Sequence, residues 1–163
     1  MRRTVRALTP DDLQATHALR LQALHDAPTA FGSSPGDSFE SRDAWAKLLA
    51  GGQVYGAFDD AGSLHGMAGL ATNDRAKTRH KARMWGVYVA AEARGQGLAR
   101  ALVAHVVEAA RGRAAWLDAA VAADNAAAIH VYEAAGFTRY GTEPAALRVD
   151  GRDVDLHLLT LRL

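Results

Sequence analysis

The stretch Val87-Tyr88-Val89-Ala90-Ala91-Glu92-Ala93-Arg94-Gly95-Gln96-Gly97-Leu98-Ala99-Arg100 decides the fold. It starts inside residues 83–90, whose β-branched and aromatic side chains make them the strongest strand candidate in the chain. It ends in residues 98–111, where apolar side chains recur at helical spacing. The stretch therefore predicts a strand, a short loop that contains two glycines, and a helix that follows directly.

The loop between this strand and helix has the features of an anion-binding site. Gly95 and Gly97 have no side chains, so the backbone can curl closely around a ligand. The free N–H groups and the positive dipole end at the helix start favour a phosphate or pyrophosphate. Arg94 and Arg100 would add charge-assisted hydrogen bonds. The alternative is that the two glycines only shape a turn between strand and helix.

Two other kinds of phosphate-binding loop fit the sequence less well. A Walker A loop needs Gly-Lys-Ser/Thr, which is absent. A dinucleotide fingerprint needs a third glycine where Arg100 stands, although Asp118, about twenty residues further on, imitates the ribose-binding acid. Only one further strand–helix unit follows, which is too few for two mononucleotide-binding halves. An NAD-dependent oxidoreductase therefore stays a minor alternative.

The rest of the chain predicts a mixed sheet with helices packed on it, an α/β (α+β) class rather than a regular doubly wound repeat. At 163 residues, the chain 1–163 is expected to form a single domain. In the first helix, Leu13, Leu21 and Leu24 are expected to face inward. The other expected strands span 4–8, 54–58, 64–72, 115–121, 137–149 and 154–163, and the other expected helices span 9–25, 37–50 and 125–135.

Composition excludes several classes of function. The formal net charge of +1 gives no support to a nucleic-acid or acidic-membrane partner. The absence of cysteine rules out disulfides, thiolate nucleophiles and cysteine–zinc sites. The seven histidines are scattered without metal-binding spacing, so no metal is expected. No run of about 18 apolar residues predicts a membrane span, and a cytoplasmic protein is expected.

At these residues the chain resembles the GNAT superfamily of N-acetyltransferases. Arg94-x-x-Gly97-x-Ala99 fits the family's coenzyme A signature Q/R-x-x-G-x-G/A, and the preceding Val87-Tyr88-Val89 fits its central strand. Ala91 departs from the proline that many members carry. A second family spacing, Asn-x-x-Ala-x-x-x-Tyr-x-x-x-Gly-Phe, is matched by Asn125, Ala128, Tyr132, Gly136 and Phe137.

The resemblance implies a mostly antiparallel sheet of about seven strands flanked by about four helices and splayed between the fourth and fifth strands. Acetyl-CoA would lie in that gap. Its acetyl group would pass, by direct attack, to a primary amine of a small molecule or peptide. A non-catalytic acyl-CoA-binding module is the main alternative, and a homodimer is a further expectation.

The resemblance also implies roles for individual residues. Tyr132 is the expected general acid. The expected coenzyme-binding residues are Val87, Tyr88, Val89, Arg94, Gly95, Gln96, Gly97, Leu98, Ala99, Arg100, Asn125 and Ala128. The candidate acceptor-binding residues are Phe31, Trp85, Asp118, Glu143 and Asp155. The basic stretch 75–81 is interpreted first as a solvated β-hairpin turn, with a contact to the 3′-phosphate of coenzyme A or to an acidic partner as alternatives.

The general base stays unassigned. Many relatives carry glutamate on the central strand, where this chain has Arg83 and Trp85. The carboxylates considered instead are Glu40, Asp118, Glu143 and Asp155, and a water chain to bulk solvent is equally open.

Overall fold

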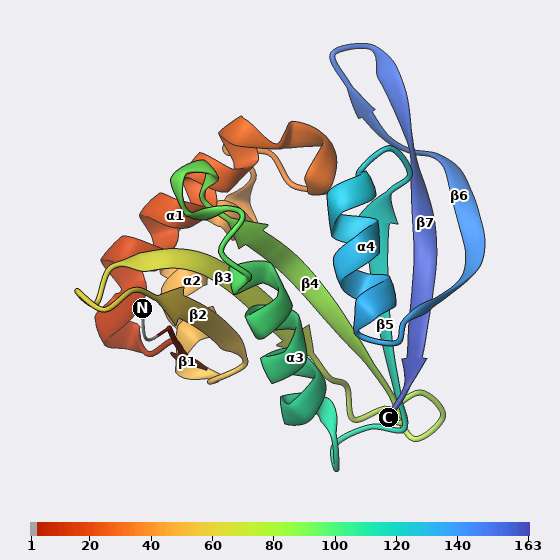
Figure 1. Ribbon diagram of the computed structural model, residues 1–163, viewed down its shortest axis with the longest axis horizontal. Helices are drawn as coiled ribbons and strands as arrows, with labels where there is room; N and C mark the ends of the chain where they lie inside the picture. The colour runs from red at the N-terminus through yellow and green to blue at the C-terminus, as the bar shows by residue number, and fades with distance from the viewer. Residues whose placement is uncertain (1–2) are drawn as a thin grey trace.

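The computed structural model describes residues 3–163, whose strands form one seven-stranded sheet (Figure 1). The strand order is β1-β2-β3-β4-β5-β7-β6, with β4 and β5 parallel and the other neighbours antiparallel. The mixed sheet with four α-helices predicted from the sequence is therefore confirmed. The strands are β1 (Thr4–Ala7), β2 (Val54–Phe58), β3 (Leu64–Ala71), β4 (Lys81–Val89), β5 (Trp116–Ala122), β6 (Thr138–Val149) and β7 (Arg152–Arg162). The α-helices are α1 (Leu13–Asp26), α2 (Arg42–Ala50), α3 (Leu98–Ala110) and α4 (Ala126–Ala134).

Local capping and turn chemistry explains several element boundaries. The side chain of Ser41 accepts a hydrogen bond from the N–H of Ala44 at 3.2 Å and so starts α2. The predicted start near residue 37 was wrong, because residues 38–40 form a separate 3₁₀ turn. Asp150 and Gly151 have φ values of 50° and 74°, as the two-residue turn of the β6–β7 hairpin requires.

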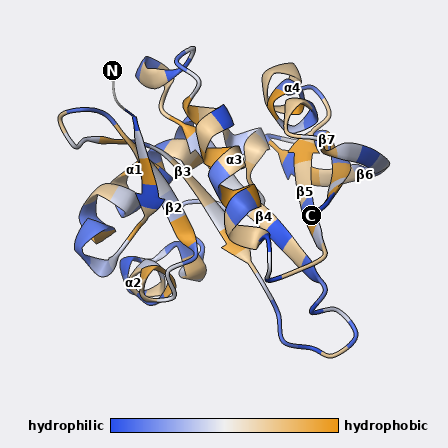
Figure 2. Ribbon diagram, turned by 60° about the horizontal axis from the view of Figure 1, so that its bottom comes forward, coloured by the Kyte–Doolittle hydropathy of each residue, from blue (hydrophilic) through white to orange (hydrophobic). Residues whose placement is uncertain are grey.

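The helices cover the two faces of the sheet unequally. On one face, α3 and α4 pack on a core that includes Leu102, Val106 and Leu117. On the other, α1 and α2 pack on β2, β3 and β4 around Trp45 and Met67. Figure 2 shows hydrophobic residues on β5 and also on α3 and β2. No residue of β5, β6 or β7 belongs to the second core, so that half of the sheet has one face without an α-helix in the described chain.

The buried face of α1 differs from the one predicted. Its buried residues are Thr16, Leu19, Arg20, Ala23 and Leu24. Of the three expected residues, Leu24 is buried and Leu13 is half buried against the second core, whereas Leu21 is half buried outside it, so the prediction was wrong for Leu21. The face that packs on the sheet thus carries a charged residue among apolar ones.

Candidate active site

β4 and β5 separate part-way along their length. Their backbone pairing ends at Arg83 and Asp118, although β4 continues to Val89 and β5 continues to Ala122. Figure 1 shows the two strands together at one end and diverging towards the other. We call the space between residues 84–89 of β4 and residues 119–122 of β5 the gap. The splay predicted between the fourth and fifth strands is therefore present.

A bulge in β4 accompanies the separation. Gly86 has a φ of 63°, and the β3–β4 register shifts between Met67 and Gly69. Extra residues in one strand bend it and increase its twist. Glycine reaches this left-handed backbone conformation without the strain that a side chain would add. The sequence at Gly86 therefore favours the bend that takes β4 away from β5.

The end of β4 presents backbone groups to the gap. Ala90 donates its N–H to the carbonyl of His65 on the β3 side at 2.8 Å. Because backbone groups alternate along an antiparallel strand, the N–H and C=O of Val89 point to the opposite side, into the gap. The carbonyl of Val89 accepts a 3.0 Å hydrogen bond from Nε of Arg94. The N–H of Val89 remains available to a ligand.

The side chain of Tyr88 lies away from the gap. It is buried in the core beneath α1 and meets Phe31 edge to face, with ring centroids 6.3 Å apart. Its hydroxyl donates to Asp26 Oδ2 at 2.7 Å. Burial, reinforced by this carboxylate, raises the pKa of Tyr88 to about 12. Only the backbone of Tyr88 thus lies at the gap.

The loop after β4 carries a run of free amides. Gly95 and Gly97 have φ values of 74° and 79°, and Gly97 is the N-cap of α3. Within the described chain, hydrogen bonds occur at the N–H of Arg94 and the N–H of Ala101 but at no N–H from Gly95 to Arg100. Free amides at a helix start, with the positive dipole end behind them, form a site for a phosphate group.

Three arginines surround this loop, and the sequence reasoning missed one of them. Nη1 of Arg3 lies 3.1 Å from the point where a Cβ on Gly97 would be. Arg100 is exposed on the first turn of α3. The Arg94 guanidinium lies 5.8 Å from the centre of the Tyr88 ring and braces the loop against β4. No local sequence signal links Arg3 to a loop so far along the chain.

Tyr132 lies on α4, which covers the same face of the sheet as α3. Its ring is 6% exposed and meets Phe137 edge to face, with centroids 5.4 Å apart. Burial raises the pKa of Tyr132 to about 12. No hydrogen bond to its hydroxyl occurs within residues 3–163. The phenol is therefore protonated at neutral pH and free to donate.

Asn125 and Ala128 belong to the start of α4. Oδ1 of Asn125 accepts a hydrogen bond from the N–H of Ala128 at 3.2 Å, so this residue caps the helix. Its Nδ2 atom is left for other partners. The small side chain of Ala128 packs at the edge of the first core.

Phe31 and Trp85 come together on the α1–α2 face of β4. Both belong to the second core, with Phe31 buried and Trp85 half buried against Trp45 at a centroid distance of 5.9 Å. The guanidinium carbon of Arg20 lies 4.8 Å from the centre of the Phe31 ring and 5.7 Å from that of Trp45. These side chains form a buried floor under the bulge of β4.

A buried ion pair fixes this floor, and the sequence reasoning did not find it. Arg20 donates from Nε and Nη2 to the two oxygens of Glu40 at 3.0 and 2.7 Å, and Trp45 donates to Glu40 at 2.9 Å. Burial opposes the ionisation of Glu40, but the hydrogen bonds from Arg20 and Trp45 outweigh it and hold its pKa below the ordinary value. Nη1 of Arg20 has no partner and lies 3.6 Å from the position of a Cβ on Gly86. A charged residue on an otherwise apolar helix face was the available signal.

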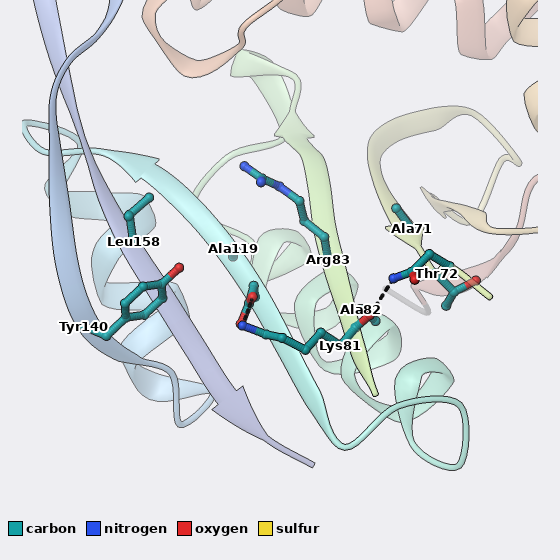
Figure 3. Close-up of a pocket in the computed structure, with 10 residues that line it drawn as sticks. Ala71, Thr72, Lys81, Ala82, Arg83, Ala119, Tyr140 and Leu158 are labelled. Atoms are coloured by element: carbon teal, nitrogen blue, oxygen red, sulfur yellow. Dashed lines mark hydrogen bonds and ion pairs between the residues drawn. The ribbon is translucent and has the colours of Figure 1, made fainter. Parts of the chain in front are cut away.

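Asp118 lines a pocket of about 280 Å³ on the open face of the sheet, where β4 and β5 begin to separate (Figure 3). Oδ2 of Asp118 pairs with Nζ of Lys81 at 2.7 Å, and Oδ1 accepts from the Thr160 hydroxyl at 2.7 Å. The hydrogen bond with Asp118 raises the pKa of Lys81. Both oxygens of this carboxylate are thus already engaged.

The remaining acidic candidates lie on the β6–β7 hairpin. Glu143 and Asp155 are exposed, and Oδ1 of Asp155 accepts from the N–H of Ala145, where β6 bulges. Neither belongs to the pocket around Asp118. Glu40 is held by Arg20. None of the four carboxylates considered from the sequence is therefore a free base at the gap.

The basic stretch 75–81 does not reach residues 94–100, which we call the phosphate loop. Arg79 and His80 line a hollow together with residues 112–115, which follow the C-terminal end of α3. The phosphate loop lies at the other end of that 13-residue helix, about 20 Å away. Residues 76–80 form an exposed turn, as the main interpretation of this stretch predicts, and their distance from the loop does not favour a contact with the 3′-phosphate.

Residues 3–163 contain no group of three or more histidine, aspartate or glutamate side chains placed to hold a metal ion. Within the same residues, no helix is both long and apolar enough to cross a bilayer.

Comparison with known proteins identifies the class of enzyme. The model of the acetyltransferase (GNAT) family matches residues 19–137, which include the gap, the phosphate loop and Tyr132. The chain belongs to the acetyltransferase (GNAT) family. The expected enzyme, an N-acetyltransferase with acetyl-CoA as donor, is confirmed. The sheet of this acetyltransferase has one parallel pair, which excludes the doubly wound dinucleotide-binding alternative.

Individual relatives agree with this assignment. The acetyltransferase is 31% identical over 160 residues to phosphinothricin N-acetyltransferase of Alcaligenes faecalis, a match covering 96% of this chain and 80% of the relative. It is 30% identical to ribosomal-protein-alanine N-acetyltransferase of Brucella melitensis, with a TM-score of 0.84 and coverage of 98% and 99% of the two chains. A phosphinothricin acetyltransferase of Sinorhizobium meliloti, solved in complex with acetyl-CoA, shares the fold at 22% identity, with a TM-score of 0.85 and coverage of 100% and 89%.

Proposed function

We propose that this acetyltransferase moves the acetyl group of acetyl-CoA to a primary amine by direct attack inside the gap between β4 and β5. The observation that carries the proposal is the combination of an unpaired β4 edge with free amides from Gly95 to Arg100. A thioester carrier with a diphosphate fits both parts, since its amide-bearing arm can pair with a strand edge and its diphosphate with the amides.

The coenzyme would lie along β4 and end at α3. The pantetheine arm pairs with the backbone of Val87 and Val89, and the diphosphate takes the loop amides. Arg3 adds a cation beside Gly97, and the Asn125 side-chain amide contributes from the start of α4. The small size of Ala128 lets α4 approach the coenzyme. Coenzyme A was expected to use Arg94 and Arg100 as well, and Arg94 acts here by bracing the loop.

The chemical step joins the amine nitrogen to the thioester carbon and expels the coenzyme A thiolate. A lysine-like amine costs about 4–5 kcal/mol to deprotonate at pH 7, so the site must take the neutral form or supply a route for the proton. The carbonyl oxygen becomes negative in the tetrahedral state, and the backbone N–H of Val87 beside the Gly86 bulge is the proposed donor to it.

Tyr132 is the proposed general acid. Its pKa of about 12 keeps the phenol protonated at neutral pH, and its hydroxyl is unpaired. A protonated, partnerless donor near the gap suits a leaving thiolate, which becomes a better leaving group when it receives a proton.

The names of the two relatives near 30% identity indicate amine acceptors of different size, phosphinothricin in one and a ribosomal protein in the other. We infer an amine acceptor that approaches from the face of Phe31 and Trp85. The cytoplasmic location and the homodimer expected from the sequence stay predictions, and size-exclusion chromatography tests the second.

Thiol release tests the proposal. The protein is incubated with acetyl-CoA and a panel of primary amines, and free coenzyme A thiol is followed. Amine-dependent thiol release is expected, together with stabilisation by coenzyme A of about 2.7 kcal/mol at 100 times its dissociation constant. Binding of coenzyme A without turnover on any amine would favour the non-catalytic module. Stabilisation by NAD and not by coenzyme A would contradict the proposed binding site.

A further inference from the structure

The open face of the sheet holds a second feature at the point where β4 and β5 part. The pocket of about 280 Å³ described above lies there, and we call it the vertex pocket. Its base is formed by Arg83 and Asp118, the last paired residues of β4 and β5. Tyr140 and Leu158 form its wall from β6 and β7. The pocket therefore adjoins the end of the gap where a bound thioester would lie.

The vertex pocket faces away from the helices that would flank the coenzyme. On β5, Leu117 and Ala119 belong to the core under α3 and α4, so Asp118 points to the opposite face. Arg83 and Trp85 share that face on β4, because Ala82 and Met84 belong to the α3 side. An acceptor can thus enter from this face while the coenzyme occupies the other.

The charges in the vertex pocket do not cancel. Lys81 and Asp118 neutralise each other at 2.7 Å, and the Thr160 hydroxyl occupies the second Asp118 oxygen. Figure 3 shows Tyr140 across the pocket from Lys81, on the β6 side. Arg83 is exposed and makes no ion pair or hydrogen bond within residues 3–163. One cation in the pocket is therefore left without a counterion.

The position of the Arg83 side chain suits it to bind an anionic group of the acceptor. Figure 3 shows its side chain extending from β4 over the opening between β4 and β5. A guanidinium there repels a protonated amine and offers a planar pair of N–H donors to a carboxylate, phosphinate or phosphate. Because the guanidinium already reaches over the gap, the anion and the amine of an acceptor need to be only a few bonds apart.

We propose that Arg83 is a specificity-determining residue that selects small amine acceptors carrying a carboxylate or another oxyanion on the same molecule. This inference rests on the proposed function and narrows its acceptor to one charge class. It also gives a role to Arg83 on the central strand, which here carries Arg83 and Trp85 and no glutamate. The oxyanion is held by Arg83, which leaves the amine directed at the thioester.

Matched pairs of acceptors test the inference. Each α-amino acid is compared with its own α-amide, which has the same side chain and amine but lacks the negative charge. The amide has the less basic amine, so a preference for the acid does not arise from easier deprotonation. The wild-type kcat/KM is expected to favour the acid by roughly tenfold or more, as a hydrogen-bonded charge pair provides.

Substitutions at Arg83 give the decisive comparison. Arg83→Gln should reduce the preference to within about threefold, and Arg83→Glu should reverse it towards amides, while acetyl-CoA affinity stays unchanged in both. Arg113→Glu is the matched control, because Arg113 is exposed before β5 and lies outside the vertex pocket. It should leave the preference as in the wild type.

Two results would overturn the inference. The first is equal wild-type activity on acids and amides. The second is an Arg83→Glu enzyme that loses activity equally on both, which would place Arg83 in the chemical step rather than in acceptor selection. Absence of thiol release with every amine would instead remove the proposed function, and this inference with it.

Discussion

Tyr132 combines the two properties that a proton donor to a leaving thiolate needs. Its hydroxyl has no partner in the described chain, and its pKa of about 12 keeps the proton in place at neutral pH. Packing of the ring against Phe137 holds it in position independently of the hydroxyl. Removing only the hydroxyl oxygen of Tyr132 should therefore affect catalysis without disturbing the packing of the ring.

Tyr132→Phe should lower kcat by about 100-fold or more, because it removes general acid catalysis while keeping the ring. The dissociation constant for acetyl-CoA should stay within about twofold, since ring packing is retained. Steady-state thiol release and isothermal titration calorimetry measure the two quantities. A variant with wild-type kcat would exclude Tyr132 as the acid.

Among single residues, the sequence predicts best those that belong to a motif with a fixed local spacing. The loop glycines and Tyr132 belong to motifs with local spacing. The structure has the glycines just before α3 and Tyr132 on α4, as that spacing predicts. Arg3 and Arg20 escaped prediction because their roles depend on contacts with Gly97 and Gly86, distant in the chain. Arg83 departs from the family pattern in the sequence, but only the structure shows that its side chain lies in a pocket on the open face of the sheet.

At the scale of elements, the Arg20–Glu40 pair joins α1 to the turn before α2. The two side chains are 5% and 3% exposed, so removing one partner leaves a buried charge. Glu40→Gln should reduce the free energy of unfolding by about 3–5 kcal/mol, and replacing Arg20 and Glu40 together by leucine should reduce it less. Urea denaturation measures both variants. Equal losses in the single and double variants would contradict the role given to the unpaired charge.

The Arg20–Glu40 pair also explains why the buried face of α1 differs from the predicted one. Helical spacing predicts Leu13, Leu21 and Leu24 on one face, whereas the buried face of α1 also includes Thr16 and Arg20. The pairing of Arg20 with Glu40 lets a charged residue occupy the buried face, and the helix turns accordingly. Periodicity finds the helix, but a long-range ion pair sets its rotation.

The phosphate loop gives an element-scale prediction with a matched control. Gly97→Trp should raise the coenzyme A dissociation constant by about 100-fold or more, because the indole would fill the space that the diphosphate needs. Gly112→Trp is the control, since Gly112 follows the other end of α3 with a φ of 78°, close to the 79° of Gly97, and has open space around it. Calorimetry compares the two. Equal affinities would count against the loop as the diphosphate site.

At the scale of the whole molecule, the functionally important feature of the sheet is the point where the pairing of β4 with β5 ends. The order of strands and helices follows from turn residues and hydrophobic periods, which the sequence displays. The length of the β4–β5 pairing cannot be predicted from these patterns, because it depends on the Gly86 bulge and on the β3 register. The unequal covering of the two faces, which leaves the vertex pocket open, is likewise a tertiary property.

Alkaline stability reports on the buried tyrosines. Burial raises the pKa of Tyr132 to about 12, whereas tyrosine in an unfolded chain titrates near 10. Between these values the unfolded state loses a proton that the folded state keeps, so the free energy of unfolding falls as pH rises. The shift corresponds to about 2–3 kcal/mol over the full window. Urea denaturation from pH 9 to 11 should show a steeper fall for the wild type than for Tyr132→Phe, and parallel curves would contradict the burial of the phenol.

The central claim is that a bare β4 edge and the free amides of the phosphate loop receive acetyl-CoA. Residue-resolved amide hydrogen exchange, with and without saturating coenzyme A, tests it most directly. The amides of Val89 and of Gly95 to Arg100 should exchange rapidly in the free protein and slow by about tenfold or more with the coenzyme. Amides of the β6–β7 hairpin should not change. Slow exchange of the loop amides in the free protein, or no change on adding coenzyme A, would contradict the account.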